Sequence, residues 1–190
     1  MRTRFALGSI ALTAVTMLPW AFTVDAAEEG SMDIRERHEI ERACERSVYT
    51  FLRLFEGEQS KTADLFTENG SVQFLPGAPK VGRETIREEY SRLETVDTNL
   101  NVLIASNLLI TAIDENNAAG FCYVTHFRHE HADSKREEQG VLRAPNSITG
   151  WSWEFRRVEG EWKISTLHAE VVLISEDLME ALEAMEAASE

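Results

Sequence analysis

The sequence predicts an α+β fold, with helices in the first half of the chain and a long, mostly antiparallel sheet in the second. Two observations predict it. Between residues 33 and 56 apolar residues recur every three or four positions, which is the spacing of one face of an α-helix. From Leu100 onward the apolar residues are rich in β-branched and aromatic types and fall in long runs separated by turn residues. With 43% apolar and 27% charged residues, the chain can bury a core.

The first expected helix spans residues 33–56. Ser31 and Asp33 are suitable N-caps, and Gly57 is a natural C-terminal stop. The other elements of the first half follow in order: a short helix over 60–66, a turn at 68–70, a short strand over 71–75 and a helix over 83–93.

Four long strands are expected in the second half, over residues 100–113, 121–131, 148–158 and 162–173. The tight turn at Glu159-Gly160-Glu161 joins the last two strands, and the polar segment 133–146 is expected to be a loop. Ser175 begins a final acidic helix over 175–190, with Leu178, Leu182 and Met185 on its apolar face.

Residues 1–26 have the pattern of an export signal. Arg2 and Arg4 precede an uncharged stretch over residues 5–24, and Val24-Asp25-Ala26 offers small residues for cleavage. An uncleaved anchor is the alternative, because about 20 uncharged residues can span a bilayer. Cleavage is favoured, so we expect a periplasmic or secreted protein without stable membrane insertion, whose main domain spans residues 27–174.

Charge and cysteine content exclude several classes of protein. The chain has 33 acidic and 19 basic residues, a net charge of -14, which repels nucleic acid. Two cysteines, Cys44 and Cys122, are too few for a disulfide scaffold and too far apart for a zinc module; whether they pair is left open. Neither a glycine-rich nucleotide loop nor a flavin signature occurs, so we expect no cofactor.

Four segments, in this order, resemble the SnoaL-like and nuclear-transport-factor-2-like superfamily over roughly residues 33–173. They are Ala63-Asp64-Leu65-Phe66-Thr67-Glu68-Asn69-Gly70-Ser71-Val72, the helix segment Gly82-Arg83-Glu84-Thr85-Ile86-Arg87-Glu88-Glu89-Tyr90, Ser106-Asn107 before an apolar strand, and Glu159-Gly160-Glu161-Trp162-Lys163-Ile164. The resemblance implies a cone-shaped curved sheet wrapped around the N-terminal helices, one pocket, and often a homodimer. It implies little about function, because the superfamily includes dehydratases, isomerases, cyclases and binding modules.

The chain departs from this family where catalytic members carry their acid–base groups. Members similar to scytalone dehydratase have an Asp, two His and an Asn where this chain has Phe55, Leu103, Cys122 and Trp151. Members similar to ketosteroid isomerase carry a carboxylate where this chain has Phe74. Aromatic and aliphatic side chains cannot titrate, so neither catalytic set transfers. These five residues, with Asn107, are instead expected to line the pocket.

His126 is the first candidate for acid–base catalysis, because it lies well inside the second long strand on the same side as Cys122. Tyr49 on the first helix could orient a substrate oxygen; the alternative is a boundary residue with its hydroxyl in water. His129 and His131 share a strand face, as two metal ligands would, but they fit better as the solvated end of a strand. We therefore predict no metal site.

Aromatic residues are expected to gather on one face of the sheet, with Phe121, Tyr123 and Phe127 beside the second set Trp151, Trp153 and Phe155. This face would be core, a dimer interface or the wall of an apolar site. The leading hypothesis is an exported, cofactor-free lyase or isomerase that acts on a small hydrophobic molecule. The alternatives are a non-catalytic ligand-binding module and a protein-interaction module.

Overall fold

Helix α1, Ile34–Phe55, provides the apolar surface around which the fold is built. The computed structural model describes residues 32–74, 78–96, 100–129, 144–176 and 178–180. The Asp33 side chain accepts a hydrogen bond from the Arg35 N–H and caps α1, as expected from the sequence. The predicted apolar face is buried, and its buried residues are Ile40, Cys44, Val48, Phe51 and Leu52.

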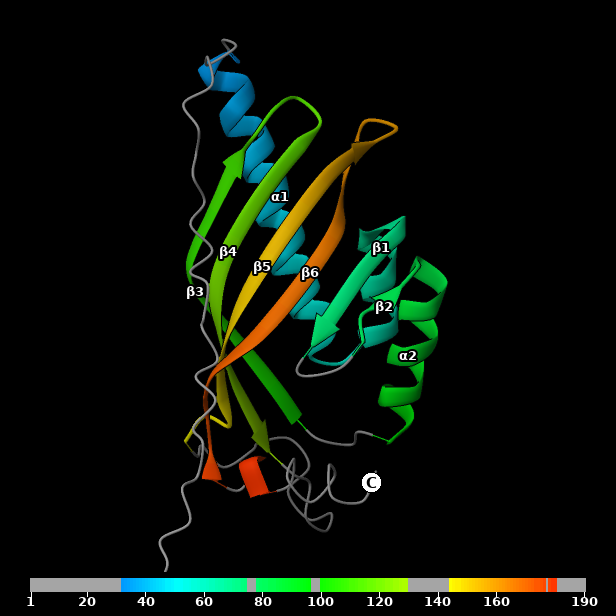
Figure 1. Ribbon diagram of the computed structural model, residues 1–190, viewed down its shortest axis with the longest axis vertical. Helices are drawn as coiled ribbons and strands as arrows, with labels where there is room; N and C mark the ends of the chain where they lie inside the picture. Colours follow the sequence, from blue (N-terminus) through cyan, green and yellow to red (C-terminus); the bar gives the residue numbers. More distant parts are fainter. Residues whose placement is uncertain (1–31, 75–77, 97–99, 130–143, 177, 181–190) are drawn as a thin grey trace, which may run out of the picture. The chain divides into compact units, whose positions relative to one another are not determined.

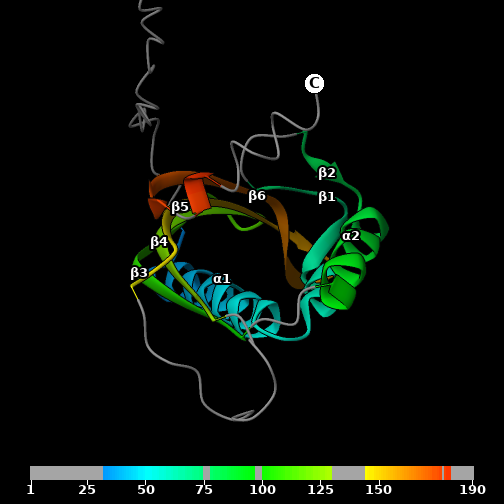
Figure 2. The ribbon, with the colours of Figure 1, turned by 90° about the horizontal axis from the view of Figure 1, so that it is seen from below.

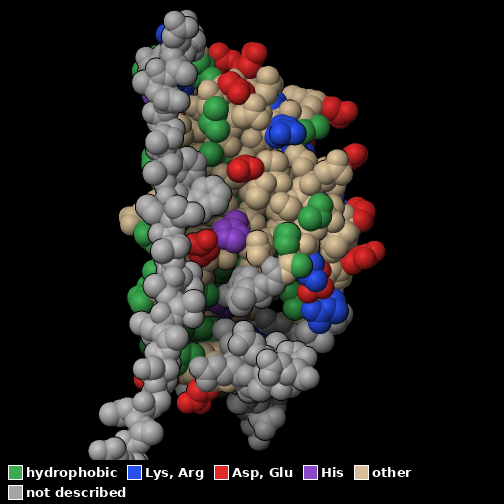
Figure 3. Space-filling model, viewed as in Figure 1, with side chains coloured by type: hydrophobic (Ala, Val, Ile, Leu, Met, Phe, Trp, Pro, Cys, Tyr) green, Lys and Arg blue, Asp and Glu red, His purple; other side chains and the backbone are tan. Residues whose placement is uncertain are grey.

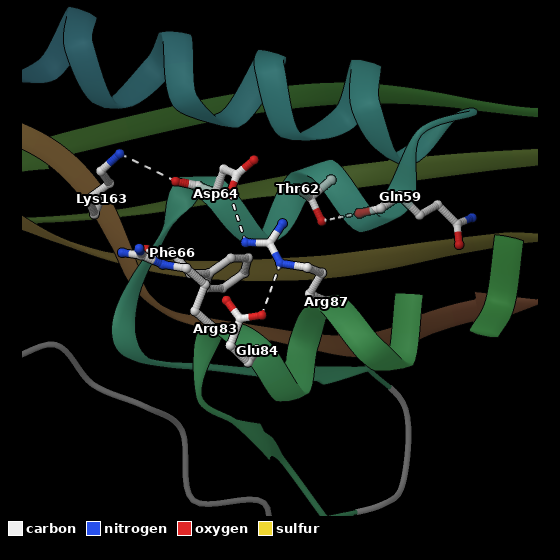
Figure 4. A network of polar contacts seen from close by, with 8 residues as sticks. All are labelled: Gln59, Thr62, Asp64, Phe66, Arg83, Glu84, Arg87 and Lys163. Carbon is white, nitrogen blue, oxygen red and sulfur yellow. Dashed lines mark hydrogen bonds and ion pairs between the residues drawn. The ribbon is translucent and has the colours of Figure 1, made fainter. Parts of the chain in front are cut away.

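The short 3-10 helix η1, Gln59–Leu65, and helix α2, Arg83–Val96, are joined by polar contacts. The Arg87 guanidinium lies 2.8 Å from the Asp64 carboxylate of η1 and 3.3 Å from the Glu84 carboxylate of its own helix (Figure 4). The Lys163 ammonium donates to the Asp64 carbonyl at 3.3 Å, which also ties η1 to strand β6. These contacts fix α2 against η1 and η1 against β6.

One six-stranded sheet combines the short strands β1 and β2 with the four long strands of the second half, in the order β2-β1-β6-β5-β4-β3. Its curve encloses α1, and α2 lies beyond β1 (Figures 1 and 2). All neighbouring strands are antiparallel except β1 and β6, which are parallel, so the predicted mostly antiparallel sheet is confirmed. The strands are β1 (Phe66–Phe74), β2 (Lys80–Val81), β3 (Leu100–Ala112), β4 (Asn117–His129), β5 (Ser147–Val158) and β6 (Glu161–Ile174).

The predicted turn at residues 68–70 is wrong, because β1 continues through it. The register of β1 against β6 shifts between Phe66 and Ser71, so the extra residues form a bulge rather than a turn. At Gly70, an added Cβ would lie 2.9 Å from the Cβ of Phe66. A glycine is therefore needed at position 70, where the backbone lies close to Phe66. This close approach explains the glycine, and the chain does not reverse its direction here.

The prediction that all the strand aromatics share one face is also wrong. In the register of β4 against β5, Phe121 pairs with Ser152 and Cys122 pairs with Trp151. Opposite residues in neighbouring strands point to the same face, so Phe121 shares a face with Ser152 and not with Trp151. Trp151 and its neighbours at 153 and 155 point toward α1 and are buried, whereas Phe121 is 39% exposed on the outer face.

The C-terminal helix begins where the sequence predicts. The Ser175 hydroxyl accepts a hydrogen bond from the Leu178 N–H, and the Ser175 carbonyl accepts one from the Met179 N–H. Leu182 and Met185 of the predicted apolar face lie outside the described residues, as does most of the predicted loop 133–146. Among the described helices, none is long and apolar enough to cross a membrane.

Candidate functional site

Aromatic rings from four elements meet at the C-terminal end of α1. Phe55 ends α1 and Phe74 ends β1, and their ring centroids lie 5.6 Å apart. Trp151 of β5 lies 5.2 Å from Phe74 and 6.4 Å from Phe55. Tyr90 of α2 contacts Phe55 edge-on at 5.5 Å. We refer to Phe55, Phe74, Tyr90 and Trp151 as the aromatic cluster; three of these positions were predicted to line a pocket.

Exposure differs within the aromatic cluster. Trp151 is 4% exposed, and its indole N–H donates to the Thr149 hydroxyl at 2.7 Å, which fixes the ring. Phe55 and Phe74 are only partly buried and cover the cluster on its solvent side. The cluster therefore offers an apolar surface whose outer rings are in contact with solvent.

Tyr90 carries the polar atom of the aromatic cluster. The residue is 2% exposed, and its hydroxyl is buried without a hydrogen-bond partner among the described residues. Desolvation by burial raises the pKa of Tyr90 well above its usual value, and the nearby Glu89 charge adds to the shift. The hydroxyl is therefore neutral at physiological pH and able to donate. Burial without a partner costs free energy, so this atom needs an explanation.

The two cysteines are free thiols in the core. Cys44 on α1 and Cys122 on β4 are both fully buried and form no disulfide. Burial raises the pKa of the Cys44 thiol to about 12 and also raises the pKa of Cys122. A protonated, buried thiol is a poor nucleophile. Cys122, which the structure pairs with Trp151, therefore belongs to the core and has no chemistry of its own.

His126 lies on the face of the sheet that turns toward α1. It is four residues after Cys122 in β4 and therefore on the same face as Cys122. Its Nε2 is 2.9 Å from Oδ1 of Asn101, a residue of β3 that is 7% exposed. An amide oxygen accepts, so this contact is a hydrogen bond from the Nε2–H of the imidazole. A neutral imidazole in that tautomer carries its lone pair on Nδ1.

Glu56 brings a carboxylate to the same part of the sheet. Its Oε1 accepts a hydrogen bond from the Leu103 N–H at 3.0 Å, and its Oε2 lies 3.0 Å from the Arg53 guanidinium. Leu103 is the register partner of His126. Because the Leu103 N–H points away from β4 to Glu56, the two partners form a non-hydrogen-bonded pair, the kind whose side chains approach more closely. An imidazole and a carboxylate thus flank Leu103.

Two predicted site residues lie elsewhere. Tyr49 is 55% exposed on the solvent side of α1, because the next helix positions around it, Val48 and Phe51, form the buried face. Asn107 is exposed, with a φ of 54°, in the irregular stretch of β3 between Ser106 and Leu109. Its left-handed backbone conformation explains the asparagine, and the residue does not line the aromatic cluster.

No group of histidine, cysteine and acidic residues within the described part of the chain is arranged to hold a metal ion. His131 and the side chain of His129 lie outside the described residues. His168 lies on the outer face of β6, where Nδ1 is 3.2 Å from Gln73 Oε1 and Nε2 is 3.1 Å from Glu170 Oε1. This histidine is therefore a surface residue, separate from the face that carries His126.

A family model described as a SnoaL-like domain matches residues 33–168, more than half of the chain. The chain belongs to the SnoaL-like family. The curved sheet around α1 confirms the fold expected from the resemblance in the sequence. No curated protein matches this SnoaL-like chain significantly.

Solved structures similar to this SnoaL-like protein share its fold at low identity. A candidate scytalone dehydratase from Novosphingobium aromaticivorans is 19% identical with a TM-score of 0.59, covering 73% of this chain and 87% of that one. A type 2 hexachlorocyclohexane dehydrochlorinase is 14% identical with a TM-score of 0.62, covering 75% and 92%. An NTF2-like protein with a cystatin-like fold, also from N. aromaticivorans, is 17% identical with a TM-score of 0.57, covering 78% and 96%.

Sequence reasoning missed three residues of this SnoaL-like site, namely Tyr90, Asn101 and Glu56. Tyr90 was expected only as part of the helix over 83–93, and its ring contacts come from two other elements, Phe55 of α1 and Phe74 of β1. Asn101 contacts His126 across 25 positions in the sequence. Glu56 directly follows Phe55, which stands where catalytic members of the family carry an aspartate. This adjacency was the one signal in the sequence that could have pointed to a carboxylate shifted by one residue.

Proposed function

We propose that this protein is a cofactor-free lyase or isomerase that acts on a small apolar molecule by acid–base catalysis, with His126 as the residue that moves the proton. The observation that carries this proposal is the 2.9 Å contact between His126 Nε2 and Asn101 Oδ1 on the face turned toward α1. Asn101 holds the imidazole in one tautomer and one orientation, which a general base requires. The family relationship supports the reaction class.

His126 is the residue that takes the proton. In an elimination, the C–H electron pair becomes the new double bond and the leaving group departs with its bonding electrons, while the proton stays on His126. In an isomerisation, His126 returns the proton to another carbon of the same substrate. Both reactions balance without an oxidant, a reductant or a bound metal ion.

Glu56 acts as a positioning residue in this scheme. Its carboxylate is anchored at both oxygens, by the Leu103 N–H and by Arg53, and its side chain is 21% exposed. By holding the backbone of Leu103, the register partner of His126, Glu56 fixes the part of β3 against which His126 lies.

The aromatic cluster is the surface we assign to the apolar substrate. The outer rings, Phe55 and Phe74, remain partly accessible, and the buried Tyr90 hydroxyl can donate to an oxygen of the bound molecule. Occupation by such an oxygen would satisfy the hydroxyl, which explains why a buried polar atom is tolerated here.

A non-catalytic binding protein is the second candidate function. It is favoured by the residues at the usual catalytic positions, since Phe55, Phe74 and Trp151 contact one another and cannot titrate. Such a protein would use the aromatic cluster alone and leave His126 as a structural partner of Asn101.

The deciding experiment follows exchange of carbon-bound hydrogen for deuterium in 2-tetralone, an apolar ketone with acidic C–H bonds, by proton NMR in deuterated buffer. We expect exchange above the buffer rate, reduced about 100-fold in His126→Gln, which keeps a hydrogen-bonding group toward Asn101. His168→Gln on the outer face is the matched control and keeps the wild-type rate. Equal rates for wild type and His126→Gln would contradict the role of His126. Binding of 2-tetralone without exchange would favour the second candidate.

Export is part of this proposal. The basic, apolar and small-residue order of residues 1–26 supports it. N-terminal sequencing of protein recovered from the periplasm or culture medium should begin at Ala27; a chain that starts at its first residues in the cytoplasm would contradict it.

A further inference from the structure

One side of helix α1 is basic, although the chain as a whole is acidic. Six exposed residues follow one another at spacings of three and four, which places them on a single line along the helix, opposite its buried face. The acidic residues of α1 lie to either side of this line, so four guanidinium groups face solvent together. We refer to the six residues as the basic stripe: Arg35, His38, Arg42, Arg46, Tyr49 and Arg53.

The centre of the basic stripe is open to a partner. The side chains of Arg42 and Arg46 form no ion pair or hydrogen bond with any described residue. Arg53 contacts Glu56 at 3.0 Å, but its side chain is 83% exposed. Tyr49 lies between these arginines and is 55% exposed. An arginine binds a carboxylate through two parallel N–H groups, so the stripe fits a segment that carries several carboxylates.

The charge of the whole molecule restricts which acidic segment can bind there. The chain has a net charge of -14, which repels a free polyanion before it reaches α1. Figure 3 shows the outer side of the sheet, with α1 behind it, and acidic side chains lie there mainly toward the top and the right-hand margin. An acidic segment of the same chain does not approach from solution, because the covalent connection holds it nearby at an effective concentration on the order of millimolar.

We propose that the acidic C-terminal segment of this chain, residues 176–190, binds the basic stripe of α1 within the same molecule. We refer to this segment as the acidic tail. It contains six acidic residues and no lysine, arginine or histidine. Residues 181–190 of the tail lie outside the described residues. The contact would cover the side of α1 that faces away from the sheet.

The acidic tail begins within reach of the basic stripe. Ile174 at the end of β6 and Leu103 of β3 stand in line across four neighbouring strands, about 14 Å apart along the sheet. The Leu103 N–H donates to Glu56, the residue that follows α1. From Glu56, Arg42 lies about 21 Å back along the helix. Fifteen residues of tail extend to about 50 Å, so the tail is long enough to reach the centre of the stripe.

The test attaches a nitroxide spin label to the acidic tail through Ala188→Cys and records the amide signals of the ¹⁵N-labelled protein by NMR. The native thiols of Cys44 and Cys122 are buried, so the label reacts at the new position. We expect the amide signals of α1 around Arg42 and Arg46 to lose most of their intensity and to regain it when the nitroxide is reduced. At 1 M salt, where the Debye length falls to about 3 Å, the loss should become much smaller.

Two variants establish which arginines are responsible. Arg42→Gln/Arg46→Gln should abolish the loss of intensity in α1, because it removes the two open guanidinium groups at the centre of the basic stripe. Arg156→Gln/Arg157→Gln is the matched control: it removes two exposed arginines of β5, changes the net charge equally and should keep the loss. The same spectra establish that each variant is folded.

Several outcomes would overturn the proposal. One is undiminished intensity throughout α1, and another is a loss that persists in Arg42→Gln/Arg46→Gln or at 1 M salt. Mixing spin-labelled protein without ¹⁵N with unlabelled ¹⁵N protein identifies contacts between molecules; an equal loss in this mixture would mean that the tail binds a second copy. Shifts of the α1 signals on adding poly-glutamate, without broadening by the tail, would assign the stripe to a separate acidic partner.

Discussion

Replacing Tyr90 by phenylalanine should stabilise this protein. The Tyr90 hydroxyl is buried without a hydrogen-bond partner among the described residues, so folding removes it from water without compensation. The substitution deletes that oxygen and keeps the ring, whose centroid lies 5.5 Å from Phe55 and 6.4 Å from Phe74. The aromatic packing is therefore unchanged.

The size of the effect follows from two opposing terms. An unsatisfied buried polar group costs about 1–3 kcal/mol, which the substitution recovers. The void left by one oxygen, about 15 Å³, costs about 0.4 kcal/mol at about 24 cal/mol per Å³. The free energy of unfolding should thus rise by about 1–2 kcal/mol, equivalent to roughly 2–8 °C in melting temperature for a domain of this size.

Urea unfolding followed by tryptophan fluorescence measures this difference through the transition midpoint at constant slope. Tyr49→Phe is the matched control; Tyr49 is 55% exposed, so its hydroxyl is hydrated and its loss should change stability by less than about 0.5 kcal/mol. A Tyr90→Phe protein less stable than the wild type would refute the reasoning, because it would mean that the hydroxyl makes a favourable hydrogen bond. The same variant should bind 2-tetralone more weakly, since the ketone oxygen loses its donor.

Three further predictions concern stability. Folding raises the pKa of the Cys44 thiol from an ordinary 9.0 to about 12, so the thiol ionises in the unfolded chain first and stability is lost as pH rises through this window. By pH 10.5 the loss is about 2 kcal/mol in the free energy of unfolding. Chemical unfolding of Cys44→Ala across this pH range should lack that loss. Glu56→Ala should cost about 1–3 kcal/mol in urea unfolding by freeing a backbone N–H of β3, whereas Glu56→Gln, which retains an acceptor, should cost less. Gly70→Ala should destabilise the protein by about 1–3 kcal/mol, because its methyl group would lie 2.9 Å from the Cβ of Phe66. The matched control is Gly57→Ala, whose methyl group would have no atom within 4 Å and which should be neutral or slightly stabilising. Equal changes in the free energy of unfolding for the two variants would contradict the close contact at Gly70.

Elements with a strong local signal could be predicted from the sequence. The cap at Asp33 and the buried face of α1 through Ile40 and Phe51 depend on neighbours three or four residues away, so the chain itself encodes them. Ser175 was recognised as a cap for the same reason. The bulge in β1 was mistaken for a turn, because glycine and asparagine serve both structures and only the pairing with β6 distinguishes them.

The candidate site depends on contacts between distant residues. His126 was singled out by its place in a strand, but its partner Asn101 and the carboxylate of Glu56 reach that region from other elements. Three members of the aromatic cluster were expected at the pocket through the family resemblance. The fourth, Tyr90, was not, because burial of a hydroxyl is a property of the assembled core.

By itself, the sequence determined the family and the order of the main helices and strands. The tertiary structure alone decided how the strands face one another. Pairing Phe121 with Ser152 instead of Trp151 turns the aromatics of β4 to the outside and those of β5 to the core. The physical reason is the two-residue repeat of a strand: a shift of one residue between neighbours exchanges the two faces, and nothing local in either strand fixes that shift.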